Sequence, residues 1–182
     1  MKRRHLLCLL ASALPLPTFA HPVPDVPVRS FFEADGSSRI EVEIDTRCFT
    51  ADPENEPYLV NRVFKQFTEA EKSALVTKAQ AFIPKTVALF IEPSGKVDPT
   101  FEYTFTSHRG EPLVGDEDPV MVTAIWKSKP DPRPKAYRIE ALPEGKLSVL
   151  FLNHVNDQAV PRFQVLFPGE KSYRLDIPGS AQ

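Results

Sequence analysis

The sequence is poor in cysteine, the residue that cross-links many small exported proteins. Its 182 residues include two cysteines, Cys8 and Cys48. Cys8 falls in an N-terminal segment that we expect to be removed, so Cys48 would stand alone and no internal disulfide could form. We interpret Cys48 as a small buried hydrophobe, with a reactive thiol, a metal ligand or an intermolecular disulfide as the alternatives.

Long apolar runs and concentrated positive charge are also missing after the first 20 residues. No later run approaches the roughly 20 apolar residues of a membrane helix, so we expect no transmembrane helix in the mature chain. The formal net charge of the whole sequence is −2. We exclude nucleic acid as a partner, because binding to phosphates requires clustered lysine and arginine.

Motifs for common reactions are absent as well. The sequence has no glycine-rich phosphate loop, no G-x-S-x-G elbow and no H-E-x-x-H metal motif. Glu41 with Glu43 falls on a strand face that we expect to be solvated, and such carboxylates lack the burial that splits two pKa values. We therefore assign no catalytic residue, and we favour a non-enzymatic role over an enzymatic one.

The sequence does contain an export signal. Three basic residues, Lys2 to Arg4, precede the apolar run Leu6–Leu14, and Ala20 is a small residue at a suitable cleavage position. These features predict a signal peptide over residues 1–20 and a periplasmic or secreted protein. The remaining residues, 21–182, suit a single domain with its own core.

Short strands separated by turns follow this leader. The segments 28–32 and 39–45 flank an Asp35-Gly36 turn, which predicts a hairpin whose second strand has one apolar face and one wet face. Further strands are expected at residues 87–91, 101–106, 120–126, 137–141, 147–152, 162–167 and 172–177. The pattern predicts a mainly β fold, an antiparallel immunoglobulin-like β-sandwich.

One stretch, about residues 56–83, has helical rather than strand periodicity. Thr68 and Glu71 form the pattern of a capping box, apolar residues continue at helical spacing to Ile83, and Pro84 is expected to end the helix. We predict two short helices here, inserted between strands of the sandwich.

Three histidines follow the predicted cleavage point: His21, His108 and His154. An N-terminal histidine can chelate a metal through its α-amino group and ring Nδ1, and a second histidine completes a three-nitrogen site suited to copper. Pro22 has no amide proton, so Cu(II) cannot recruit the second backbone nitrogen. We therefore take His21, His108 and His154 as candidate metal ligands and copper as the candidate cofactor. Ordinary packing is the alternative for all three.

The mature start, His21-Pro22-Val23-Pro24, precedes a strand, an Asp-Gly turn and a second strand. Over about residues 20–49 this arrangement resembles the extracytoplasmic beginning of HupE/UreJ-type bacterial membrane proteins, which implies handling of nickel or another metal. The N-terminal histidine and the predicted sandwich are also similar to periplasmic copper-binding proteins of the CopC type, although those lack an insert like residues 56–83.

These features favour an exported, non-enzymatic binding module that interacts with a membrane or envelope partner. The alternative is a periplasmic copper-binding protein that uses the mature N-terminal His21 with His108 or His154. An oxidase built on the same histidines ranks last, because it would also need an open face for its substrate.

Overall fold

A hairpin near the start of the chain forms the middle of the larger of two β-sheets in the computed structural model, which describes residues 23–178. Strands β1 (Val26–Phe32) and β2 (Ser38–Asp45) pair antiparallel. Gly36 in the connecting turn has a φ of 85°, a conformation that glycine adopts without strain. The hairpin predicted from the sequence is therefore confirmed.

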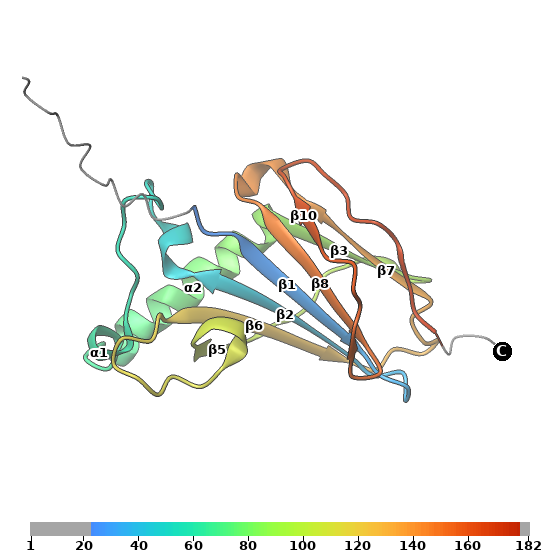
Figure 1. Cartoon of the computed structure of the whole chain (residues 1–182), viewed down its shortest axis with the longest axis horizontal. Helices are drawn as coiled ribbons and strands as arrows, with labels where there is room; N and C mark the ends of the chain where they lie inside the picture. The colour runs from blue at the N-terminus through green and yellow to red at the C-terminus, as the bar shows by residue number, and fades with distance from the viewer. Residues whose placement is uncertain (1–22, 179–182) are drawn as a thin grey trace, which may run out of the picture.

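The large sheet has the strand order β10-β8-β1-β2-β6-β5, and β9 also pairs with β8 (Figure 1). Its other strands are β5 (Glu102–Thr106), β6 (Met121–Ser128), β8 (Val149–Val155), β9 (Gln158–Ala159) and β10 (Gln164–Leu166). All its pairs are antiparallel except β1 with β8, which is parallel. The prediction of a wholly antiparallel sandwich is wrong at this pair, because alternation of side chains defines a strand's faces and not its direction.

The small sheet has the order β11-β7-β3-β4. Its strands are β3 (Val87–Glu92), β4 (Gly95–Val97), β7 (Ala136–Ala141) and β11 (Leu175–Asp176). This sheet and the long helix lie behind the large sheet in Figure 1, so the described chain has two layers. The fold is mainly β with two sheets, as the sequence predicts.

The core fills the space between these layers. Successive side chains of β1 and β2 point to opposite faces of the sheet. Those that point inward are buried between the layers. The buried side chains of this core come from β1, β2, the small sheet, β8 and the long helix: Val26, Val28, Ile40, Val42, Ile44, Ala79, Ile83, Leu89, Ile91, Tyr137, Ile139 and Phe151.

Two α-helices occupy the predicted insert, α1 (Asn61–Phe64) and α2 (Glu69–Thr86). The predicted capping box is present: Thr68 accepts from the backbone N–H of Glu71, and the Glu71 carboxylate accepts from the backbone N–H of Thr68. Pro84 does not end α2, which continues to Thr86. The Thr86 hydroxyl donates to the carbonyl of Phe82, which supports the last turn.

Three short 3₁₀ helices complete the secondary structure of residues 23–178: η1 (Thr46–Phe49), η2 (His108–Gly110) and η3 (Pro143–Gly145). Within the same residues, neither α-helix combines the length and apolar character that crossing a membrane requires. The first two 3₁₀ helices lie at one end of the large sheet, where they bring polar side chains together.

Candidate functional site

The outer face of the large sheet, the face turned away from the core, carries a row of carboxylates on β2. Glu41, Glu43 and Asp45 alternate there with the core residues of the same strand. They are only 7 %, 4 % and 6 % exposed. The prediction of a wet face for this strand is therefore wrong.

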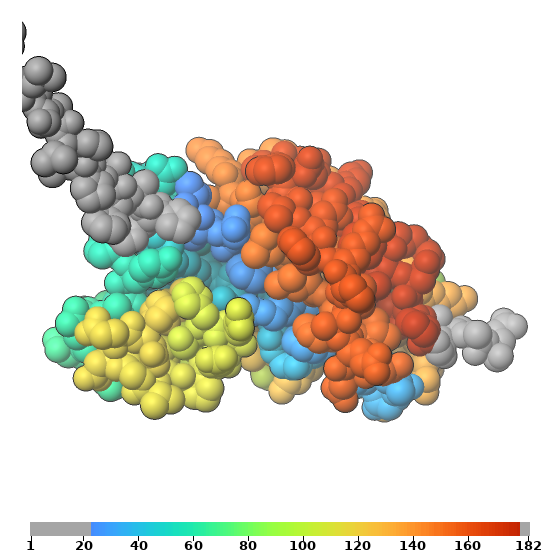
Figure 2. All heavy atoms as spheres, in the orientation of Figure 1, coloured from blue at the N-terminus to red at the C-terminus, as the bar shows by residue number. Residues whose placement is uncertain are grey.

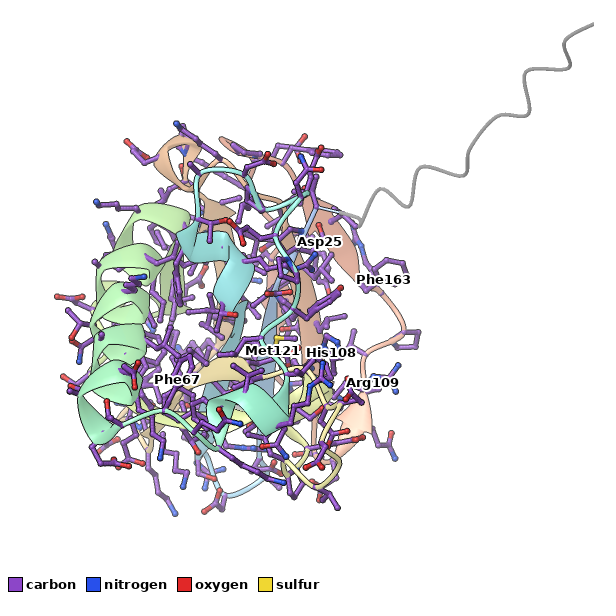
Figure 3. All side chains as sticks on the ribbon, turned by 90° about the vertical axis from the view of Figure 1, so that its left-hand side faces the viewer. Asp25, Phe67, His108, Arg109, Met121 and Phe163 are labelled. Atoms are coloured by element: carbon purple, nitrogen blue, oxygen red, sulfur yellow. The ribbon has the colours of Figure 1, made fainter. Side chains whose placement is uncertain are left out.

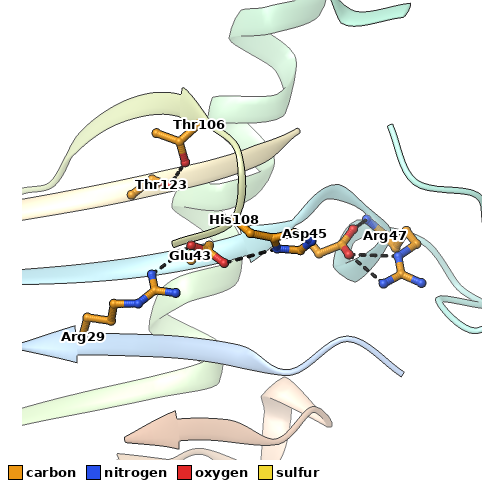
Figure 4. Close-up of polar contacts among 7 residues, drawn as sticks. All are labelled: Arg29, Glu43, Asp45, Arg47, Thr106, His108 and Thr123. Atoms are coloured by element: carbon orange, nitrogen blue, oxygen red, sulfur yellow. Dashed lines mark hydrogen bonds and ion pairs between the residues drawn. The ribbon is translucent and has the colours of Figure 1, made fainter. Parts of the chain in front are cut away.

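Arginine side chains explain this burial, because each carboxylate on β2 has its own arginine partner. Arg29 on β1 donates from Nη1 to Glu43 Oε2 at 2.8 Å (Figure 4). Arg39 pairs with Glu41 in the same way along β2. The guanidinium groups neutralise the buried carboxylates, although Arg39 itself stays 42 % exposed.

The third pair, Asp45 with Arg47, joins the end of β2 to η1. The Asp45 carboxylate accepts from the backbone N–H of Arg47 at 2.9 Å and from its Nε and Nη2 at 2.9 and 2.7 Å (Figure 4). The guanidinium also lies over the ring of Tyr58, 3.7 Å from its centroid. Arg47 is only 3 % exposed, and its Nη1 has no hydrogen-bond partner among the described residues.

A pocket of about 200 Å³ opens beside these pairs, at the end of the sheet where the described chain begins. Val23 and Pro24 line it together with Glu43, His108 and the buried thioether of Met121. Asp25 also lines this pocket, and burial raises the pKa of its carboxyl above the ordinary value. We call this space the N-terminal pocket.

His108 enters the N-terminal pocket from η2, the turn that follows β5. Arg109 and Gly110 have φ values of 62° and 75°, so the chain reverses sharply directly after His108. The Nδ1 atom of His108 lies 3.7 Å from Glu43 Oε1, and the ring packs edge-on against Tyr58 with centroids 6.4 Å apart. Figure 3 shows His108, Asp25 and Met121 on the side of the molecule opposite α2.

His154 lies elsewhere on the same outer face. It sits on β8 opposite Phe31, and the two rings stack with centroids 4.7 Å apart. Phe31 is four residues beyond Pro27, which lines the N-terminal pocket, and that spacing is about 13 Å along a strand. The structure therefore does not bring His154 to the pocket that holds His108. The third candidate, His21, lies outside the described residues.

Two further sequence hypotheses concern metals and thiols. Residues 23–178 contain no group of three histidine, cysteine, aspartate or glutamate side chains that could hold a metal ion by themselves. Cys48 lies in η1, and burial raises the pKa of its thiol to about 12. A thiol of that pKa stays protonated at neutral pH, which agrees with the interpretation of Cys48 as a buried hydrophobe.

An exposed apolar row lies at the opposite edge of the large sheet. Phe163, Val165 and Phe167 alternate along the edge strand β10 and its flanks, and they are 66 %, 39 % and 61 % exposed. Val165 pairs with Leu150 of β8, so this edge row continues onto the next strand. Figure 2 shows a hollow over blue β1, between yellow side chains around η2 and the orange-red C-terminal quarter of the chain.

Sequence reasoning considered Glu43 but set it aside as solvated, and it missed Arg29, Asp45 and Arg47 as charged residues of this face. One signal was available, because arginines lie at cross-strand and i,i+2 positions from the carboxylates of β2. Comparison of the whole chain with known proteins finds no matching family model, no similar curated protein and no similar solved structure.

Proposed function

We propose that the chain is an exported, non-enzymatic binding module that uses the outer face of its large sheet to engage a membrane or envelope protein. The observation that carries this proposal is the row Phe163, Val165 and Phe167 on β10. A row of large apolar side chains on an open sheet face is typical of a surface that another protein covers. We also propose that the two sheets are arranged as in an immunoglobulin-like β-sandwich.

Site-specific photocrosslinking in the cells that export the chain tests this proposal. A crosslinking amino acid at Phe163 should give one discrete adduct with an envelope protein. The same amino acid at Thr77, exposed on α2 in the opposite layer, serves as the matched control. Loss of the Phe163 adduct in a Phe167→Ser background would support the proposal, and identical adducts from both positions would refute it.

A copper-binding role is the second candidate, favoured by the composition of the N-terminal pocket. Val23 and Pro24 line the same pocket as His108. Two residues of fully extended chain span at most about 7 Å, so covalent geometry limits how far His21 can be from Val23. The α-amino group of a new N-terminus has a pKa near 7.7–8.0, so Cu(II) readily displaces its proton. The amine, the His21 ring and the His108 ring would then supply three nitrogen ligands.

Copper titration of a chain that starts at His21 tests this candidate. We expect tight Cu(II) binding that one extra N-terminal residue abolishes, because the extension removes the free amine next to the imidazole. His108→Gln should weaken binding, whereas His154→Gln, the matched control on the same face, should not. Equal affinity of the extended and the free chain would exclude this role.

A further inference from the structure

Glu43 uses its two carboxylate oxygens for two different partners. Oε2 accepts from Arg29 Nη1 at 2.8 Å, and Oε1 lies 3.7 Å from His108 Nδ1. The side chains of Glu43 and Arg29 are 5 % and 13 % exposed, whereas that of His108 is 55 % exposed. The buried pair therefore forms a fixed base from which Oε1 faces a more accessible ring (Figure 4).

The orientation of the His108 ring follows from its two contacts. The Nδ1 edge faces Glu43, and Tyr58 packs at an interplanar angle of 83°. Nε2, on the far side of the ring, makes no hydrogen bond to any described residue. The distance from Nδ1 to Oε1 is longer than a direct hydrogen bond, so Glu43 acts on the ring through its negative charge across 3.7 Å.

The charge of Glu43 selects the position of the proton on a neutral His108 ring. A carboxylate in front of Nδ1 stabilises an N–H directed toward it and opposes a lone pair there. The proton then resides on Nδ1, and the lone pair of Nε2 is free. Histidines that bind metals use this arrangement, with the second ring nitrogen donating to a carboxylate or carbonyl.

We infer that Glu43 is a positioning residue that holds His108 in the Nδ1–H form, so that Nε2 is the ring atom offered to a metal in the N-terminal pocket. This inference deepens the copper candidate described above and names its ligand atom. His154 provides a contrast on the same face, because its Nδ1 is buried with no hydrogen-bond partner among the described residues.

Nuclear magnetic resonance of the metal-free protein tests the inference without copper. Long-range ¹H–¹⁵N spectra distinguish the two neutral tautomers of each histidine. We expect the Nδ1–H form at His108 in the wild-type protein and the Nε2–H form in the double variant Arg29→Met/Glu43→Met. The double variant removes both charges together, so no buried arginine is left unpaired. An Nε2–H tautomer at His108 in the wild-type protein would overturn the inference.

Copper binding supplies the second measurement. Loss of an outer carboxylate partner typically weakens metal affinity by about 10- to 100-fold, and we expect this loss in Arg29→Met/Glu43→Met. The matched control Arg39→Met/Glu41→Met removes the neighbouring pair of the same strand, which faces no histidine, and should bind as the wild type does.

The two measurements separate the inference from the candidate function. Failure of the wild-type chain to bind Cu(II) would exclude the copper role, while the tautomer would still report whether Glu43 orients His108. Wild-type binding with equal loss in the Glu43 and Glu41 double variants would assign Glu43 a merely structural role and refute the inference. Unchanged thermal unfolding of each variant is the control for folding.

Discussion

Replacing Asp45 by Asn should destabilise the end of the sheet that holds the N-terminal pocket more than the substitution of an exposed residue does. Asp45 and Arg47 are 6 % and 3 % exposed, and three hydrogen bonds join them. Asn keeps the size of the side chain and one acceptor for the Arg47 N–H. Its amide NH₂ would face the Nε and Nη2 donors of Arg47, and the charge of the buried guanidinium would lose its partner.

The expected cost follows from the burial of this pair. Removing one partner of a buried ion pair costs about 3–5 kcal/mol, because the remaining charge stays out of water. For a domain of this size, about 4 kcal/mol corresponds to a Tm lower by about 8–16 °C. Urea unfolding followed by circular dichroism measures the change in free energy, and calorimetry measures Tm.

Two further variants make the reasoning refutable. Glu117→Gln breaks the pair with Arg62, whose side chains are 59 % and 70 % exposed, and should change stability by less than about 1 kcal/mol. Asp45→Asn/Arg47→Met removes both charges and should restore most of the loss, because apolar replacement of a buried pair is often neutral. A loss at Asp45→Asn no larger than at Glu117→Gln would show that Arg47 is not effectively buried.

Three more outcomes follow from the same structure. In a chain that starts at residue 21, the Cys48 thiol, with its pKa raised to about 12 by burial, should resist alkylation at neutral pH until urea unfolds the protein. Hydrogen bonds from Thr68 lower the pKa of Glu71 below 4.5, so the capping box stabilises the fold above pH 4.5 and loses this effect as pH falls; Glu71→Gln should flatten the acid limb of the stability curve. Phe151→Ala should cost about 3–5 kcal/mol in urea unfolding, because its ring is fully buried between the sheets.

The sequence predicts the local elements well where one physical signal dominates. The alternation along residues 39–45 and the Asp35-Gly36 turn predict the β1–β2 hairpin that the structure has. Thr68 and Glu71 predict the start of α2 for the same reason, because the capping box is a contact between residues close in the chain. Such signals require no knowledge of distant residues.

Long-range partners account for what the sequence does not predict. The sequence predicts a helix from about residue 56, but the carbonyl of Leu59 accepts from the backbone N–H of Val120, and Val60 forms a β-bridge with Pro119. These contacts draw the chain into an extended path and shorten α1 to one turn. The sequence also predicts solvated carboxylates on β2. Their burial depends on arginines and on a turn that come close to them only in the folded chain.

The candidate site was predictable only in part. His108 was singled out because it ends a strand, and the structure places it in the pocket lined by Val23. His154 was singled out by the same argument and lies instead against Phe31. A strand-end position does not reveal which neighbouring residues a side chain meets. His108 meets the N-terminal pocket, whereas His154 meets Phe31.

The parallel pairing of β1 with β8 has a consequence for the order in which the chain folds. Val26 pairs with Val149, so the first strand cannot complete its place in the large sheet until most of the polypeptide has been synthesised. Contacts of such long sequence separation make folding slow, because a long loop must close before they form. The pocket lined by Val23 therefore takes shape late in folding, because β1 beside it waits for β8.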